Sequence, residues 1–342
     1  MPELIVTNFN RNFTGVSATA AGVVRIQQGR YDMALAGVAL PGCPAPISPA
    51  EARRLSRLPP EGRPFTIWHV RRNTEMRAAL WARDVLRLPV RIVFTSAAQR
   101  RHSAFPRWLI ARMDAVIATT DAAAGYVPHV RAVVPHGVDC ARFTPAPDRA
   151  AAWAATGYPG ARGLATIGRI RPEKGTDRFV EAMLHLLPRH PDVTALVIGR
   201  GARSDQDFLD GLRARIAAAG LSDRILFPGE VAPDALPALI RALTSIVQLP
   251  RYEGYGMAPL EGMASGVPFV ATDAGYYRNF SAQGTAGIVT EDATGALDAL
   301  LADPARHAAM ARAARAVAEA GFSIEHEADG IGRVYDMLWS GQ

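Results

Sequence analysis

Short apolar runs alternate with longer amphipathic stretches along the chain, and this alternation predicts its secondary structure. In the first half, runs rich in Val, Ile and Leu have the length of strands and are separated by stretches with helical periodicity. The predicted strands here are 4–9, 31–38, 65–70, 90–95, 114–119 and 131–134, and the predicted helices are 16–28, 74–87 and 105–113. Such alternation is typical of βαβ units and a mostly parallel sheet.

The alternation stops at 136–151, a segment rich in Pro and turn residues that is typical of an interdomain linker, and then restarts. The predicted strands of the second half are 163–170, 193–199, 224–229, 245–250 and 267–272, and the predicted helices are 174–187, 205–219, 234–243, 257–265 and an alanine-rich tail from about 295. A chain of 342 residues also suggests two domains. The sequence thus predicts an α/β protein with two Rossmann-like, doubly wound domains that face a cleft, 1–145 and 146–323.

Composition narrows the class of protein. Hydrophobic residues make up 49% of the chain and charged residues 20%, as in globular proteins. No apolar run approaches the roughly 18–20 residues that span a bilayer, and the N-terminal LIVTNF is expected to be a strand rather than part of a signal peptide. Two cysteines, Cys43 and Cys140, lack the number and spacing of a disulfide framework or metal site. A cytoplasmic protein is expected.

Charge is distributed unevenly along the chain. Residues 1–150 contain 20 Arg and no Lys against 10 Asp and Glu, a net charge of +10, whereas residues 151–342 contain 18 basic and 22 acidic residues, a net charge of −4. This asymmetry indicates that the first domain meets an anionic partner. Lys174 is the single lysine of the chain.

The stretch RYEGYGMAPLEGMASG, residues 251–266, joins a predicted strand to a predicted helix. It places Glu253 in the loop and Glu261 inside the helix, while Gly254 and Gly256 let the backbone approach a ligand. The amides of Met257 and Ala258, in the first helical turn, would favour a phosphate. A ligand with a central diphosphate and a polyol at each end, a sugar at Glu253 and a ribose at Glu261, fits this pattern. The alternative is a glutamate that only stabilises the helix dipole.

A second candidate stretch, ATIGRIRPEKGTD, places Arg169 and Lys174 in the loop after another predicted strand. Arginine binds two phosphate oxygens at once and lysine supplies a compact charge, so the pair predicts a diphosphate clamp. With these cations available no metal or other cofactor is required, and Asp205 and Asp207 are expected to cap a helix instead. The alternative is a solvated pair of loop charges.

Candidate residues of the first domain follow its predicted strands. Gly15 precedes a helix and could approach an anion, although a plain βα turn is equally compatible. His69 ends a strand, where it would face the cleft and contact a sugar, or else make a structural hydrogen bond. The basic residues expected to bind an anionic acceptor are Arg71, Arg72, Arg100 and Arg101.

The residues from Glu253 to Glu261, together with Gly168-Arg169 and Lys174-Gly175, resemble those of the retaining glycosyltransferases of family four, which have the GT-B fold. Segments 135–145 and 227–231 resemble the pre-linker segment and base-binding strand end of that family. The resemblance implies a metal-independent enzyme whose final helix, about 324–342, packs back on the first domain. One departure is that a single Gly15 stands where many relatives have paired glycines.

The resemblance also implies roles for individual residues. It assigns catalysis to Glu253, Arg169, Lys174 and His69, and binding of the nucleotide-sugar donor to Gly15, Arg169, Lys174, Gly199, Glu230, Val231, Gly254, Tyr255, Gly256, Met257, Ala258 and Glu261. Within the family, 68–84 and 95–120 look like bacterial lipopolysaccharide core mannosyltransferases. That likeness implies GDP-mannose as donor and an anionic glycolipid acceptor, lipid A carrying 3-deoxy-manno-octulosonic acid (Kdo). The basic first domain and its Phe105 and Trp108 would then contact the inner membrane peripherally, and the alternative is a core helix with charged flanks.

Three alternatives remain open at this stage. The donor could be a UDP-hexose and the acceptor another glycan or lipid. A nucleotide-sugar epimerase of the same fold would consume donor without an acceptor. A basic α/β nucleic-acid-binding protein would also explain the net charge of +10, but aromatic residues that would stack on bases are absent between the arginines.

Overall fold

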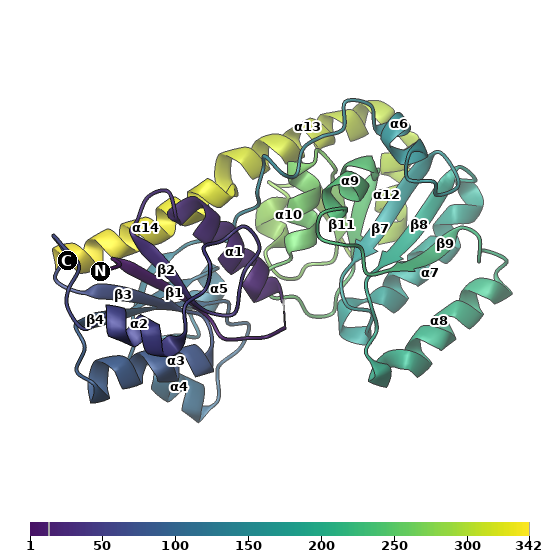
Figure 1. Cartoon of the computed structure of the whole chain (residues 1–342). Helices are drawn as coiled ribbons and strands as arrows, with labels where there is room; N and C mark the ends of the chain where they lie inside the picture. The colour runs from purple at the N-terminus through teal and green to yellow at the C-terminus, as the bar shows by residue number, and fades with distance from the viewer. Residues whose placement is uncertain (13, 342) are drawn as a thin grey trace. The chain divides into compact units, whose positions relative to one another are not determined.

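The computed structural model describes residues 1–12 and 14–341, which divide into two units, each described by itself. Unit 1 comprises Met1–Gly137 and Ile324–Gln342, and unit 2 comprises Val138–Ser323. Each has a six-stranded sheet in which all paired strands are parallel. The predicted architecture of two doubly wound α/β units is therefore confirmed (Figure 1).

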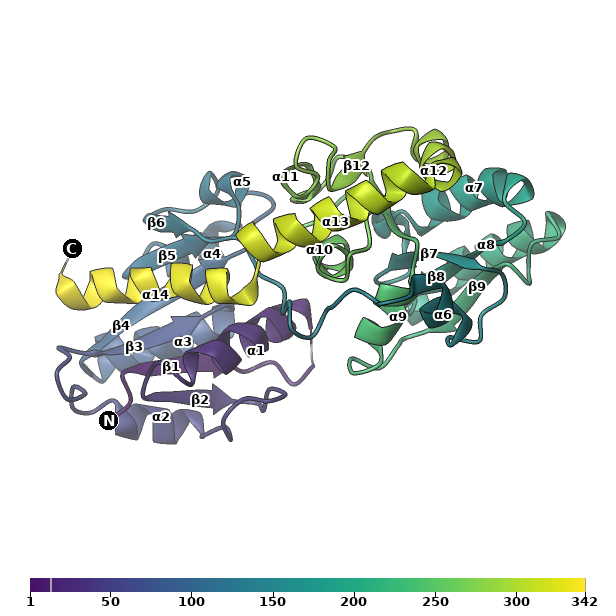
Figure 2. The ribbon, with the colours of Figure 1, turned by 90° about the horizontal axis from the view of Figure 1, so that it is seen from above.

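Unit 1 has the strand order β2-β1-β3-β4-β5-β6. Its elements are β1 (Leu4–Asn8), α1 (Gly15–Gln27), β2 (Met33–Gly37), α2 (Pro49–Leu55), β3 (Thr66–Val70), α3 (Asn73–Leu80), the π-helical turn η1 (Trp81–Val85), β4 (Val90–Ser96), α4 (Ala104–Ile110), β5 (Ala115–Ala118), α5 (Asp121–Ala124), β6 (Val130–Val133) and α14 (Ile324–Ser340). Helices α1 and α14 lie side by side on one face of this sheet, as Figure 2 shows. The strand order reverses between β1 and β3, which is where ligands commonly bind in open α/β sheets.

Unit 2 has the strand order β12-β11-β10-β7-β8-β9. Its elements are α6 (Arg149–Ala154), β7 (Arg162–Ile167), η2 (Pro172–Lys174), α7 (Thr176–Leu186), η3 (Leu187–Arg189), β8 (Val193–Ile198), η4 (Arg203–Asp205), α8 (Gln206–Ala218), β9 (Ile225–Gly229), α9 (Leu236–Ala242), β10 (Ser245–Gln248), α10 (Met257–Ala264), β11 (Phe269–Ala271), α11 (Tyr277–Phe280), β12 (Gly287–Val289), α12 (Ala293–Ala302) and α13 (Pro304–Gly321). Here the strand order reverses between β7 and β10. The two loops singled out from the sequence follow these two strands.

The boundary between the units lies eight residues earlier than the sequence suggested, at Gly137/Val138 rather than 145/146. The Val138 amide donates to the Phe322 carbonyl at 2.8 Å, and Val138 and Phe143 are part of a core cluster of unit 2. The predicted linker therefore packs on unit 2, and part of it forms α6, whose N-cap Asp148 accepts from the Ala151 amide. Helix α14 belongs to unit 1, where its Ile331, Val334 and Tyr335 pack under the sheet.

Candidate active site

The loops after β7 and β10 are fastened together at the carboxyl edge of the unit 2 sheet. Gly175, at φ +69°, lies so close to the end of β10 that a Cβ atom would stand 1.8 Å from the Leu249 carbonyl oxygen. The Arg251 amide donates to the Glu173 carbonyl at 3.0 Å, and its guanidinium makes two hydrogen bonds to Asp177, at 2.6 and 2.7 Å. These contacts hold the loop after β7, which carries Arg169 and Lys174, against the loop after β10, which carries Glu253.

Lys174 and Glu253 meet directly at this edge. The Lys174 ammonium donates to Glu253 Oε2 at 2.6 Å, and both side chains are partly exposed, at 23% and 17%. The other oxygen, Glu253 Oε1, accepts from the Gly254 amide at 2.8 Å. The structure thus brings together a cation and a carboxylate that are 79 positions apart in the sequence. A compact charge beside a hydroxyl-accepting carboxylate can serve a phosphorylated sugar.

Helix α10 begins beside this pair. Its N-cap Gly256 has φ +97°, and a Cβ atom there would lie 2.1 Å from Cε1 of the Tyr277 ring, so both conformation and space require glycine. Met257 and Ala258 form the first turn and are partly exposed. Their amides have no partner earlier in the helix and point toward the N-terminal end, where they favour an anion.

Tyr255 is buried, and its ring stacks on Tyr276 with 5.3 Å between centroids. The Tyr276 amide donates to the Tyr255 carbonyl at 2.9 Å, which ties the glycine-rich loop to the segment after β11. The Tyr255 ring therefore shapes the loop from within the core of unit 2.

Glu261 lies one turn into α10, and burial raises its pKa to about 7, with Arg142 acting weakly in the opposite direction. A carboxyl group in such surroundings is only partly ionised at neutral pH. Hydrogen-bond donors such as a pair of ribose hydroxyls would stabilise the ionised form, so the group is suited to the predicted contact.

The remaining donor-site candidates of unit 2 lie at the same edge, because β7, β8 and β9 are neighbours. Arg169 is exposed and has no hydrogen bond or ion pair with any residue that the structure describes. Gly199 has φ +139°, and a Cβ atom there would lie 1.9 Å from the Gly168 carbonyl oxygen, so it permits close approach of the ends of β7 and β8. Glu230 is exposed, 3.8 Å from Arg200, and Val231 is partly buried.

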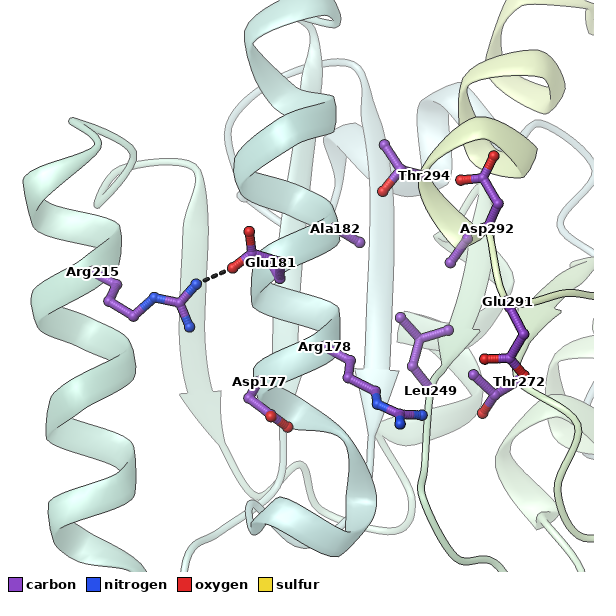
Figure 3. A pocket seen from close by; sticks show the side chains of 11 residues that line it. Asp177, Arg178, Glu181, Ala182, Arg215, Leu249, Thr272, Glu291, Asp292 and Thr294 are labelled. Atoms are coloured by element: carbon purple, nitrogen blue, oxygen red, sulfur yellow. Dashed lines mark hydrogen bonds and ion pairs between the residues drawn. The ribbon is translucent and has the colours of Figure 1, made fainter.

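A pocket of about 470 Å³ between α7 and α12 shares only Asp177 and Leu249 with this arrangement (Figure 3). It is lined by Asp177, Arg178, Glu181, Ala182, Arg215, Leu249, Thr272, Glu291, Asp292, Ala293 and Thr294. Its walls carry more carboxylates than cations, and Arg215 is already paired with Glu181. A diphosphate would be repelled there, so the loops after β7 and β10 are the better candidate for a donor site.

In unit 1, Gly15 is the first residue of α1, and neither a positive φ nor a close neighbour requires glycine there. That it contacts a phosphate stays a prediction, and Phe13, two residues earlier, lies outside the described residues. Arg72 braces this region: its Nη1 donates to Asn8 and Glu75, both at 3.0 Å, and its Nη2 to Thr14 and Ser17. The guanidinium of Arg72 thus donates to side chains of unit 1 itself, so it is less available to an acceptor than the sequence suggested.

The prediction that His69 faces an open cleft is wrong. Its side chain is completely buried, Nδ1 lies 2.5 Å from the Tyr335 hydroxyl, and Nε2 lies 2.7 Å from Thr95 Oγ1. Burial holds the pKa of His69 well below its usual value, so the ring is neutral. Since both ring nitrogens are occupied, His69 is a structural histidine that links β3, β4 and α14, which is the alternative left open by the sequence.

The other acceptor candidates differ in their surroundings. Arg100 and Arg101 are exposed on the segment between β4 and α4, whereas Arg71 is partly buried directly after β3. Within residues 1–12 and 14–341, no group of three His, Cys, Asp or Glu side chains is placed to hold a metal ion. Over the same residues, no helix combines the length and apolar character needed to cross a bilayer.

Sequence reasoning missed the residues that position the others. Arg251 starts the quoted motif, but its pairing with Asp177 joins segments 74 positions apart. Tyr277, whose ring faces Gly256, follows an unpredicted turn after β11. Gly175 could have been found from the sequence, because a glycine immediately before a helix is a signal for a special backbone conformation.

Comparison with known proteins agrees with this geometry. The family model described as Glycosyl transferases group 1 matches residues 158–317. The lipopolysaccharide core biosynthesis mannosyltransferase LpcC of Rhizobium leguminosarum bv. viciae is 43% identical over 343 residues, covering 98% of this chain and 96% of that protein. LpsB of Rhizobium meliloti (strain 1021), which carries the same description, is 42% identical over 347 residues, covering 98% and 97%.

Solved structures show the same fold. The C-terminal domain of the group 1 glycosyltransferase LpcC from Francisella tularensis aligns with a TM-score of 0.53 and 34% identity, covering 55% of this chain and all of that one. Anabaena Alr3699/HepE, in complex with UDP and glucose, aligns with a TM-score of 0.82 over 99% of this chain and all of its own, at 17% identity. The two Rhizobium proteins LpcC and LpsB are 43% and 42% identical to this chain over nearly its whole length. The chain, with its two parallel-sheet units, therefore belongs to the group 1 glycosyltransferase family.

Proposed function

We propose that the chain transfers mannose from GDP-mannose to a lipopolysaccharide core acceptor of the Kdo–lipid A type, with retention of the anomeric configuration. The contact between Lys174 and Glu253 is the main support for this proposal. It puts a cation suited to phosphate beside a carboxylate suited to sugar hydroxyls, where the strand order of unit 2 reverses between β7 and β10. The choice of mannose and of the lipopolysaccharide core follows the descriptions of the two relatives that match nearly the whole chain, and GDP and the Kdo–lipid A type of acceptor follow the family resemblance of the sequence.

In this proposal each part of the donor meets one element of the site. The ribose hydroxyls donate to Glu261, the diphosphate lies against the first amides of α10, Arg169 and Lys174, and the mannose hydroxyls donate to Glu253. The bond between the anomeric carbon and the phosphate oxygen breaks as the bond to the acceptor oxygen forms on the same face. The acceptor proton passes to the departing phosphate oxygen. Lys174 and Arg169 act where negative charge develops, which is the stage at which fixed charges lower a barrier most.

The donor is tested by thermal shift with GDP, UDP and ADP, each alone and as a common sugar conjugate, followed by an assay of mannosyl transfer to Kdo–lipid A. A ligand that binds only the folded state stabilises it by about 2.7 kcal/mol at 100 times its dissociation constant. We expect GDP and GDP-mannose to raise the melting temperature and the other nucleotides to leave it unchanged. Selective stabilisation by UDP and a UDP-hexose would replace the proposed donor, and donor turnover without acceptor would favour the epimerase alternative.

Peripheral contact with the inner membrane is the second part of the proposal. Phe105 and Trp108 on α4 are 53% and 50% exposed, stack with a centroid distance of 6.2 Å, and have Arg112 over the Trp108 ring at 3.8 Å. A neighbouring pocket is lined by Trp108, Tyr126 and the side chains of Arg101 and Arg107. Exposed aromatic rings among arginines suit the interface of an anionic bilayer.

Sedimentation with vesicles tests this contact. We expect the protein to bind phosphatidylglycerol vesicles, and the double variant F105S/W108S to bind them about tenfold more weakly because two interfacial rings are lost. Leu58→Ser removes another exposed apolar side chain of unit 1 and serves as the matched control. Equal binding by all three proteins would contradict a contact through α4.

A further inference from the structure

Arg71 is partly buried, and its guanidinium has no hydrogen-bond or ion-pair partner among the residues that the structure describes. It follows β3 directly, its Nη1 is buried without a hydrogen bond, and its guanidinium makes no ion pair with any described residue. Its neighbour Arg72 differs, since that guanidinium donates to four side chains. An unpaired buried charge is costly, so a site that retains one is suited to an anion supplied from outside.

The carboxylates near Arg71 are already occupied. Glu75 accepts from the amides of Phe9, Arg71 and Arg72 and from the Arg72 guanidinium. Glu327 accepts from His136 Nδ1 and from the Gly137 amide, both at 2.8 Å. Burial lowers the pKa of Arg71 although Tyr335, Glu327 and Glu75 act in the opposite direction. The guanidinium therefore stays short of negative charge in the protein alone.

Thr119 offers a hydroxyl on the same face of the sheet. Its side chain is 1% exposed, and Oγ1 is buried without a hydrogen-bond partner. Residues 69 and 93 are partners in the register of β3 and β4, as are 93 and 115 in that of β4 and β5. Because side chains alternate along a strand, positions 71, 95 and 119 share one face. With strands about 4.8 Å apart, the Cα atoms of Arg71 and Thr119 lie roughly 10–12 Å apart, a gap that an arginine side chain and one oxyanion can fill.

Ser96 provides a contrast. Its hydroxyl is also buried without a partner, but it belongs to the opposite face of β4, with Ile92 and Phe94. The face of Arg71 and Thr119 is the one that carries Val93, Ala115 and Tyr335. Ser96 is therefore a matched control, an equally buried and unpaired hydroxyl outside the candidate site.

We propose that Arg71 and Thr119 hold an anionic group of the acceptor, a carboxylate or a phosphate, at the carboxyl edge of the unit 1 sheet. This inference rests on the proposed function, since it assumes an acidic glycolipid as acceptor. Arg71 makes charge-assisted hydrogen bonds to the anion, and the Thr119 hydroxyl donates to a third oxygen. The two neighbouring arginines therefore have different roles: Arg71 binds the acceptor, whereas Arg72 donates to side chains of unit 1 itself.

The first test needs no acceptor. Melting temperatures are measured in inorganic phosphate, in acetate and in chloride at equal ionic strength, for the wild type and for Arg71→Gln, Thr119→Val and Ser96→Ala. We expect phosphate or acetate to stabilise the wild type and Ser96→Ala but not Arg71→Gln, with a reduced shift for Thr119→Val. In chloride, Arg71→Gln should melt no lower than the wild type, because it removes an uncompensated charge. Retention of the anion shift by Arg71→Gln, or a drop of several degrees in chloride, overturns the inference.

The second test uses acceptor analogues. Arg71→Gln should raise KM for the acidic acceptor about 100-fold while kcat and the affinity for GDP stay close to wild type. If the anion is a carboxylate, the difference between variant and wild type vanishes with the methyl-esterified acceptor; if it is a phosphate, it vanishes with the dephosphorylated one. Unchanged KM with normal mannosyl transfer overturns the inference alone. Loss of the phosphate shift in Arg71→Gln, in a protein that transfers no mannose to Kdo–lipid A, supports the anion site and overturns the proposed function.

Discussion

Replacing Lys174 with methionine should lower kcat for mannosyl transfer by about 1,000-fold, the size of effect that removal of one preorganised group at a developing charge can have. Methionine keeps much of the length of the side chain but has no charge for the departing diphosphate. It also leaves Glu253 without the partner that lies 2.6 Å away. Steady-state kinetics with saturating GDP-mannose measure the change.

Two further variants separate local chemistry from general effects. Lys174→Arg keeps the charge and should retain part of the activity, whereas Arg306→Met removes an exposed cation of α13 in unit 2 and should have wild-type kinetics. The same assay in excess EDTA should show full activity, because the proposed clamp consists of side chains. A Lys174→Met variant with near-normal kcat, or activity that is lost reversibly in EDTA, would contradict the clamp.

Replacing Glu261 with glutamine should have opposite effects on binding and on stability at pH 8. Ionised Glu261 accepts the ribose hydroxyls in our proposal, so Glu261→Gln should bind GDP about 100-fold more weakly. In the free protein the folded-state pKa of Glu261, about 7, lies above the ordinary value of 4.5, so ionisation costs folding free energy. The protonated carboxyl therefore contributes stability that is fully present below pH 4.5 and is lost as the pH rises through 7. By linkage the difference reaches about 3 kcal/mol, and unliganded Glu261→Gln should melt several degrees above the wild type at pH 8.

The pH dependence of binding follows from the same group. Because the nucleotide selects the ionised carboxylate, wild-type affinity for GDP should fall as the pH drops below 7, approaching tenfold per unit, while that of Glu261→Gln should stay flat. Calorimetric titrations between pH 5.5 and 8.5 measure both proteins. Parallel pH profiles for the two proteins would show that the titrating group lies elsewhere.

Much of the fold could be predicted from the sequence because its signals are local. The strand that ends in Gln248 is short and wholly buried, and a glycine directly precedes the helix after it, so the position of Glu253 at a carboxyl end followed directly. Short elements escaped prediction: α2, α6 and α11 have seven, six and four residues, and β12 has three, too few to show a period.

Contacts between distant segments could not be predicted in the same way. Lys174 reaches Glu253 because β7 and β10 are neighbours in the sheet. Neither segment alone indicates this strand order. The ring of His69 is hydrogen-bonded to Tyr335, 266 positions later in the sequence, and the guanidinium of Arg72 to Thr14 and Ser17. Residues of unit 2 could be assigned from a motif, whereas those of unit 1 required the structure because several arginines of similar appearance have different partners.

The membership of α14 in unit 1 has a consequence for how the chain is made. Residues 138–323 are one continuous stretch, so all the parts of unit 2 have been synthesised while unit 1 still lacks its last helix. Tyr335 and Trp339, which complete the apolar layer beneath β1 and β3, are synthesised after all of unit 2. Unit 1 therefore begins before unit 2 and is completed after it, and premature termination between unit 2 and α14 would yield a chain with an intact second unit and a first unit whose sheet face is covered by α1 without α14.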